Sequence, residues 1–129
     1  MKLVHAFAFA AVFALTACRS APQLHADRTQ VLTGEDIVVT IDGSLEGRAF
    51  DQYWIALQPA EAPVTDVSGR IVLERREHEV RFHTTAPGAY EVRLHDRYPK
   101  VEHHLVARLP ILVDGYPVKT AAQLEVARP

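Results

Sequence analysis

The sequence contains one cysteine, one methionine and one tryptophan among its 129 residues. A lone cysteine cannot form a disulfide within the chain, so the folded part has to be stable without one. Basic and acidic residues number 14 and 16, which leaves no positive field of the kind that attracts nucleic acid. The composition therefore excludes a disulfide-stabilised scaffold and predicts no nucleic-acid partner.

The sequence also lacks the motifs of common catalytic sites. No serine lies in a Gly-x-Ser-x-Gly elbow, and no glycine-rich phosphate-binding loop is present. The neighbouring carboxylates of Glu35 and Asp36 fall in a predicted turn, where their side chains diverge. We therefore expect a protein that is not an enzyme.

The most apolar stretch of the chain lies at its start. Residues 3–17 contain no lysine, arginine, aspartate or glutamate, and they follow the positively charged Lys2. A positive start, a short apolar run and then small residues are typical of a secretory signal peptide, and the run is too short to span a bilayer comfortably. We predict that residues 1–17 are a signal peptide.

The end of this stretch reads Leu15-Thr16-Ala17-Cys18 and resembles the lipobox of bacterial lipoproteins. The resemblance implies that the Cys18 sulfur receives a diacylglyceryl group and that Cys18 becomes the new N-terminus. It thus implies a periplasm-facing envelope protein attached to the membrane by its lipid, with no other cofactor. The next residue is Arg19, not the aspartate that retains enterobacterial lipoproteins in the inner membrane, so the resemblance favours the outer membrane.

Cleavage before Cys18 leaves 112 residues, which is the length of one domain. Residues 18–29 are polar, contain a proline and lack periodicity, so they are predicted to form a lipidated tether. The domain itself is expected at residues 30–114. Residues 115–129 are predicted to be a C-terminal tail or an extra edge strand.

The remaining sequence favours strands separated by turns, without long helical patterns. The predicted strands are 37–41, 52–58, 70–76, 79–84, 90–96 and 104–114. About seven short strands of this kind predict an all-β fold, a single antiparallel immunoglobulin-like β-sandwich. The alternation in 90–96 places Tyr90, Val92 and Leu94 inward, and it places Arg93 and His95 on an outer face that we interpret as solvated.

Two local features are similar to immunoglobulin-like domains. Trp54 lies in the middle of a predicted strand, where such sandwiches often bury one tryptophan between their sheets. The segment from Pro87 to Tyr90 resembles the tyrosine corner, in which the tyrosine hydroxyl bonds to nearby backbone. Residues 30–114 as a whole resemble the small immunoglobulin-like or fibronectin-type-III-like modules of bacterial envelope proteins, through motifs such as PGAYEVRL and LVARLPILV. The resemblance implies a non-catalytic binding or structural accessory module with an envelope protein as its partner.

Histidines near the last two predicted strands support an alternative. His95 ends one strand and His103 and His104 begin the next, with Glu102 beside them. Imidazole and carboxylate groups suit zinc or copper, so the alternative is a metal-handling envelope lipoprotein. Because His103 and His104 are adjacent, they point to opposite faces if they lie in a strand. The same residues are also compatible with a pH-responsive surface or with exposed histidines that bind nothing.

The loop between these two strands is a candidate interaction site. It contains Asp96, Arg97, Tyr98 and Lys100. Aromatic and arginine side chains on loops carried by a rigid sheet are favoured at protein interfaces. The second interpretation is that Tyr98 packs over the end of the sandwich.

Overall fold

A computed structural model describes residues 22–43, 45 and 51–116. The predicted signal peptide, Cys18 and residues 117–129 lie outside this part. The described residues form eight strands and no helix. Accordingly, they include no helix with the length and apolar character needed to cross a membrane.

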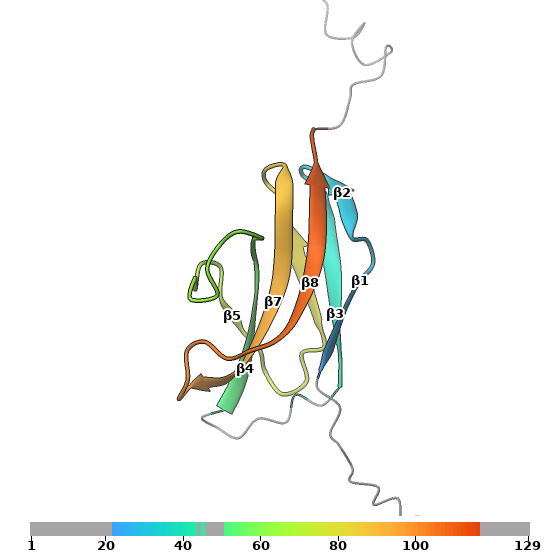
Figure 1. Ribbon diagram of the computed structural model, residues 1–129. Coiled ribbons are helices and arrows are strands. Elements are labelled where there is room, and N and C mark those ends of the chain that lie inside the picture. Colours follow the sequence, from blue (N-terminus) through green and yellow to red (C-terminus); the bar gives the residue numbers. More distant parts are fainter. Residues whose placement is uncertain (1–21, 44, 46–50, 117–129) are drawn as a thin grey trace, which may run out of the picture.

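The eight strands form two sheets (Figure 1). They are β1 (Gln23–Ala26), β2 (Gln30–Leu32), β3 (Asp36–Asp42), β4 (Asp51–Pro59), β5 (Ile71–Val72), β6 (Glu79–His83), β7 (Gly88–Pro99) and β8 (Leu105–Asp114). One sheet has the order β1-β3-β6 and the other β2-β8-β7-β4-β5. The all-β prediction is confirmed, but the count is eight, and β2 pairs with β8 in parallel rather than antiparallel.

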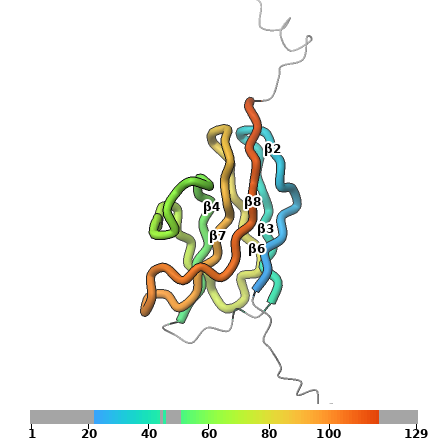
Figure 2. Tube along the Cα trace, in the orientation of Figure 1, coloured from blue at the N-terminus to red at the C-terminus, as the bar shows by residue number. Residues whose placement is uncertain are grey.

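The main core lies between the two sheets. In β3 every second residue points inward, so that Ile37, Val39 and Ile41 are at most 1% exposed. They belong to one apolar cluster with Val92 and Leu94 of β7. The two sheets, which are seen one behind the other in Figure 2, therefore enclose an apolar interior. Removing this apolar surface from water contributes about 25 cal/mol per Å².

The first strand corrects the predicted tether. β1 lies within residues 18–29 and pairs with β3, from Gln23 opposite Asp42 to Ala26 opposite Val39. Leu24 is its one fully inward apolar side chain, at 9% exposure. Because a four-residue edge strand with a single buried residue shows no detectable alternation, the sequence pattern did not reveal it.

The strand predicted at 70–76 is much shorter than expected. Only Ile71 and Val72 pair with β4, opposite Ile55 and Trp54. A turn follows directly, in which the Glu77 amide donates to the Glu74 carbonyl at 3.0 Å. The apolar run Ile-Val-Leu made the segment look like a longer strand.

The tyrosine corner is confirmed. The Tyr90 hydroxyl donates a hydrogen bond of 2.9 Å to the carbonyl of Ala86, four residues earlier. This bond ties the start of β7 to the turn that precedes it. It is the contact that the resemblance implied.

Trp54 is fully buried, yet it does not lie between the sheets. Its neighbour Ile55 belongs to the central apolar cluster, whereas Trp54 is outside that cluster and pairs with His95 of β7. Successive side chains of a strand point to opposite faces, so Trp54 faces away from the sheet–sheet interior. The expectation of a tryptophan between the sheets was wrong.

Candidate functional site

The outer face of the five-stranded sheet carries a second buried layer. Five side chains of β4 and β7 alternate with the core residues and point away from the core, yet each is at most 2% exposed. They are Trp54, Ala56, Gln58, Arg93 and His95. The connection between β4 and β5, residues 60–70, bonds to these side chains. A loop thus shields a face that would otherwise meet water.

Arg93 fastens this loop to the sheet. Its guanidinium donates to the carbonyls of Ala60 and Pro63 at 3.1 and 3.2 Å, and to the Gln58 side-chain oxygen at 3.3 Å. Its Nε donates to the Glu91 carboxylate at 2.9 Å. Arg93 is 2% exposed, so our interpretation of it as a solvated strand residue was wrong.

Gln58 holds the far part of the same loop. Its side-chain amide donates to the carbonyls of Asp66 and Ser68 at 2.8 and 3.1 Å. Its oxygen accepts from Arg93, so both ends of the amide are used. The buried polar groups of Gln58 and Arg93 are therefore hydrogen-bonded to the loop backbone and to each other, as burial requires.

Next to these anchors lies a series of stacked planar groups. The rings of Trp54 and His95 are parallel within 2°, with centroids 3.9 Å apart. Arg70, at the end of the loop, places its guanidinium carbon 4.7 Å from the Trp54 ring centroid and 4.5 Å from that of Tyr98. Contacts of a cation with ring faces are attractive, so this stack joins β4, β7 and the loop before β5.

Several buried nitrogens in the stack and in the nearby His103 lack a hydrogen-bond partner. They are both ring nitrogens of His95, Nδ1 of His103, and Nε and Nη2 of Arg70. The pKa of His95 is lowered to about 4, chiefly by burial and then by the positive charges of His103, Arg93 and Arg70. His95 is consequently neutral at pH 7, and it packs as an aromatic ring.

The structure does not assemble the four predicted metal ligands into one set. The His104 ring pairs with the Asp96 carboxylate, and His103 Nε2 lies 3.7 Å from a Glu102 oxygen. His95 is stacked on Trp54. Across residues 22–43, 45 and 51–116, no three histidine, cysteine, aspartate or glutamate side chains are grouped so as to hold a metal ion.

Three residues of the candidate interaction loop, Asp96, Arg97 and Tyr98, lie at the end of β7 rather than in a loop, and Lys100 follows them at the tip of the β7–β8 hairpin. Tyr98 is half-buried against Arg70, as our second interpretation expected, and Lys100 Nζ lies 3.5 Å from Asp51. Arg97 is exposed and has a φ of 62°, in the left-handed region that non-glycine residues seldom occupy. The tip is thus a defined turn that presents Arg97 to solvent.

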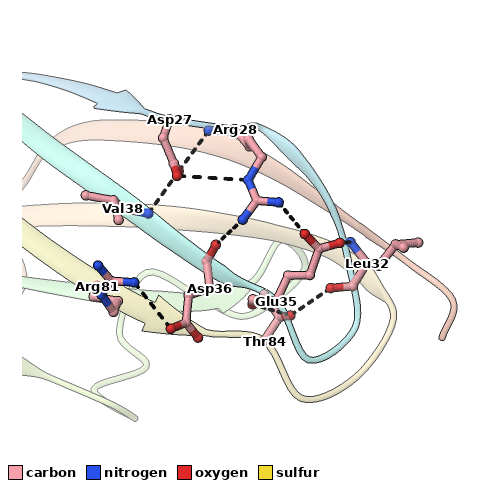
Figure 3. Close-up of polar contacts among 8 residues, drawn as sticks. All are labelled: Asp27, Arg28, Leu32, Glu35, Asp36, Val38, Arg81 and Thr84. Atoms are coloured by element: carbon pink, nitrogen blue, oxygen red, sulfur yellow. Dashed lines mark hydrogen bonds and ion pairs between the residues drawn. The ribbon is translucent and has the colours of Figure 1, made fainter. Parts of the chain in front are cut away.

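A separate charged cluster connects the start of β3 to its neighbours (Figure 3). The Arg28 guanidinium pairs with Glu35 and donates to the Asp36 carbonyl at 2.7 Å, while the Asp27 carboxylate accepts from the Val38 amide at 2.9 Å. The Leu32 amide and then Arg28 hold the pKa of Glu35 below its usual range. These contacts are internal to the turns that they join, and we interpret the cluster as structural.

Three residues of the outer layer were not recognised from the sequence: Gln58, Arg70 and Arg93. The alternation of apolar and polar residues along a strand is the same whether the outer face is exposed to water or covered by a loop. Trp54 gave one indication, because a tryptophan that points away from the core has to be shielded from water by another part of the chain. The long connection after that strand was the candidate for this cover.

No protein-family model matches this chain, and no curated protein is detectably similar to it in sequence. The fold is similar to the PKD domain of the human VPS10 domain-containing receptor SorCS2, with 19% identity, a TM-score of 0.50, and coverage of 77% of this chain and 76% of that one. A weaker likeness, with 11% identity and a TM-score of 0.40 over 75% of this chain and 93% of that one, is to the CARDB domain of the PF1109 protein from Pyrococcus furiosus, solved in complex with di-metal ions.

The likeness to the PKD domain supports an immunoglobulin-like β-sandwich for this chain. At this identity the likeness concerns the fold alone.

Proposed function

We propose that this chain is the precursor of a lipid-anchored bacterial envelope protein whose immunoglobulin-like domain acts as a non-catalytic binding or structural module. The observation that carries the proposal is the position of Cys18, directly after a charged start, an apolar run and the residues Leu15-Thr16-Ala17. The fold is the one that such a module requires, since the described residues form two packed sheets around an apolar core.

The anchor would hold the domain close to the lipid surface. β1 begins at Gln23, so only residues 19–22 separate it from Cys18. Five residue steps span at most about 18 Å when fully extended. The proposed tether is therefore short, and the module would lie beside the membrane rather than far above it.

The short tether would keep one end of the module near the lipid surface. β1 begins at the same end of the sandwich as the tip of the β7–β8 hairpin (Figures 1 and 2). That tip presents Arg97, which is exposed, and Val101, which is 37% exposed. We propose that it meets an envelope protein near the membrane, with the stacked layer behind it acting as a rigid support. Because Arg19 follows the cysteine, we place this membrane as the outer one.

Metabolic labelling tests the anchor. In a bacterial host, radioactive palmitate should label the chain and a Cys18→Ala variant should lose the label. A Ser20→Ala variant, altered two residues away, serves as the matched control and should retain it. Equal labelling of the Cys18→Ala variant would contradict the proposal.

Site-specific crosslinking tests the binding surface. A photo-reactive residue at position 97 should yield a discrete adduct with an envelope protein. The same residue at Thr40, an exposed position on the other sheet, should not. Identical adducts from both positions would contradict a role for the hairpin tip.

A further inference from the structure

Among the described residues, the longest strand at the edge of a sheet is β6. It has five residues, whereas the other edge strands, β1, β2 and β5, have four, three and two. β6 pairs with β3 without a register shift, and it contains neither proline nor glycine. It therefore lacks the short length, the proline and the bulge that usually keep an edge from pairing with another chain.

The hydrogen bonds of the β3–β6 pair determine which backbone groups of β6 face outward. The Ile41 amide of β3 donates to the carbonyl of His78, directly before β6, at 2.8 Å. In an antiparallel pair, the residues that bond to the partner strand alternate with residues that do not. The amides and carbonyls of Glu79, Arg81 and His83 therefore point to the free side of the sheet.

The side chains of these three residues lie on the exposed face of the sheet. The side chains of Arg81 and His83 are 65% and 62% exposed, and both lie beside the Asp36 carboxylate. Among the described residues, none forms an ion pair with Glu79. The free edge thus carries opposite charges two residues apart, at Glu79 and Arg81.

This charge pattern is complementary to itself in one register. Because the outward backbone groups belong to alternate residues, two β6 edges can pair antiparallel only in registers that differ by two residues. Symmetric pairing about Val80 places Glu79 of each copy opposite Arg81 of the other. Pairing about Glu79 or about Arg81 places like charges opposite each other, which is destabilising.

Apolar surface lies on the same open side of the sandwich. A pocket of about 190 Å³ opens between β5 and β6, with Ile71 of β5 and Phe82 of β6 in its walls. Ile71 and its neighbour Val72 are 36% and 37% exposed. A two-fold axis at Val80, perpendicular to the sheet, turns this side of each copy toward the other. Pairing of the two edges therefore removes apolar surface from water as well.

We propose that β6 is a self-association edge, at which two copies of this chain pair antiparallel about Val80. The two three-stranded sheets then join into one continuous sheet. The contact between two five-residue edges is small compared with the roughly 1,200–2,000 Å² of a stable interface, so the dimer is weak and reversible. The proposal does not depend on the lipid anchor.

Sedimentation equilibrium of residues 18–129 carrying Cys18→Ser, which contain every described strand, tests the proposal. We expect a monomer–dimer equilibrium in samples up to about 1 mM, where a millimolar dissociation constant is measurable. Glu79→Arg and Arg81→Glu each place like charges opposite one another, and each should weaken association roughly ten-fold. The double variant Glu79→Arg/Arg81→Glu re-creates the opposite charges and should restore it.

Glu61→Arg is the matched control, because it makes the same change of charge at an exposed position in the loop of residues 60–70. It should leave the dissociation constant unchanged. A protein that stays monomeric at about 1 mM would overturn the proposal. A double variant that associates as weakly as the single variants would also overturn it, as would an equal loss in Glu61→Arg.

Amide NMR spectra recorded over a dilution series identify the edge that associates. The largest shifts should occur in β6, at Glu79, Arg81 and His83, whose amides become hydrogen-bonded in the dimer. Shifts of β1 that exceed those of β6 would place the contact at the other edge of the same sheet and would contradict the proposal.

Discussion

Both faces of the five-stranded sheet are buried at β4 and β7, but by different chemistry. The inner face packs aliphatic side chains such as Ile55 and Leu94 against the other sheet. The outer face buries a tryptophan, a glutamine, an arginine and a neutral histidine beneath the loop of residues 60–70. One layer depends on exclusion of water, whereas the other depends on specific hydrogen bonds and ring contacts.

The difference predicts that the two layers fail in different ways. The inner layer is shared by both sheets, so it is lost only when the whole domain unfolds. The outer layer is held by one loop, which can open locally and let water reach the polar groups. The outer layer is therefore where this domain is able to change shape without unfolding.

The largest effect is expected for Leu94→Ala. Leu94 is 0% exposed in the inner layer, and truncation there leaves a cavity between the sheets. The free energy of unfolding should fall by roughly 2–5 kcal/mol. Urea unfolding followed by circular dichroism measures it. A loss below about 1 kcal/mol would mean that the sheets are not tightly packed at this point.

The next largest effect is expected from a change of pH, because protonation of His95 makes the free energy of unfolding depend on pH. Its pKa is about 4 in the folded protein and near 6.5 in an ordinary histidine. As the pH falls from 6.5 to 4, the unfolded chain binds a proton at this residue and the folded chain does not. The free energy of unfolding therefore falls over this window by about 3 kcal/mol, and it is retained at higher pH.

A variant isolates the contribution of His95. His95→Phe keeps a ring on Trp54 and removes the titration, so its stability should change much less between pH 6.5 and 4. Val80→Ala, a change in the inner layer that adds and removes no titratable group, is the control and should keep the slope of the unaltered protein. Emission of Trp54, the only tryptophan, follows unfolding at each pH. An unchanged slope in His95→Phe would contradict the neutral buried state.

A smaller effect on global stability is expected for Arg93→Met. The variant loses the bonds to Ala60, Pro63 and Glu91, but the loop can open and hydrate these groups. We expect a loss of about 1–3 kcal/mol. Hydrogen exchange should accelerate in residues 60–70 and remain unchanged in β3.

Arg81→Met is the matched control for Arg93→Met. The Arg81 side chain is 65% exposed on β6, so its removal should change stability by less than about 0.5 kcal/mol. If hydrogen exchange in the Arg93 variant accelerated equally in β3, the outer layer would be part of the same cooperative unit as the core.

The smallest effect is expected for Tyr90→Phe. It removes only the hydroxyl that donates to the Ala86 carbonyl at 2.9 Å. We expect a loss of about 1 kcal/mol in thermal or urea unfolding. A much larger loss would indicate that the corner organises more of β7 than this one bond shows.

The sequence predicted the inner layer better than the outer one. Period-two alternation identified Ile37, Val39 and Ile41 as a buried face, and the Pro-Gly segment before Tyr90 indicated the tyrosine corner. Both signals are local, because a strand and a turn are specified by adjacent residues. Such patterns are readable from one chain without knowledge of what packs against it.

The outer layer depends on contacts distant in sequence, and these explain the failures. Arg93 reaches a loop about thirty residues earlier, and Arg70 meets Trp54 and Tyr98 from a third segment. Nothing adjacent to Arg93 or His95 shows that a loop shields them. For the same reason, the histidines near the hairpin suggested a metal site, whereas in the structure His95 stacks on Trp54 and His104 pairs with Asp96.

The most direct test of the proposed anchored module is the intact mass of the chain purified from envelopes of a bacterial host. The account predicts a product that begins at Cys18 and carries the added mass of a diacylglyceryl group, with a further acyl group where the host supplies one. A product that retains Met1, or one whose Cys18 bears an unmodified thiol, would contradict it.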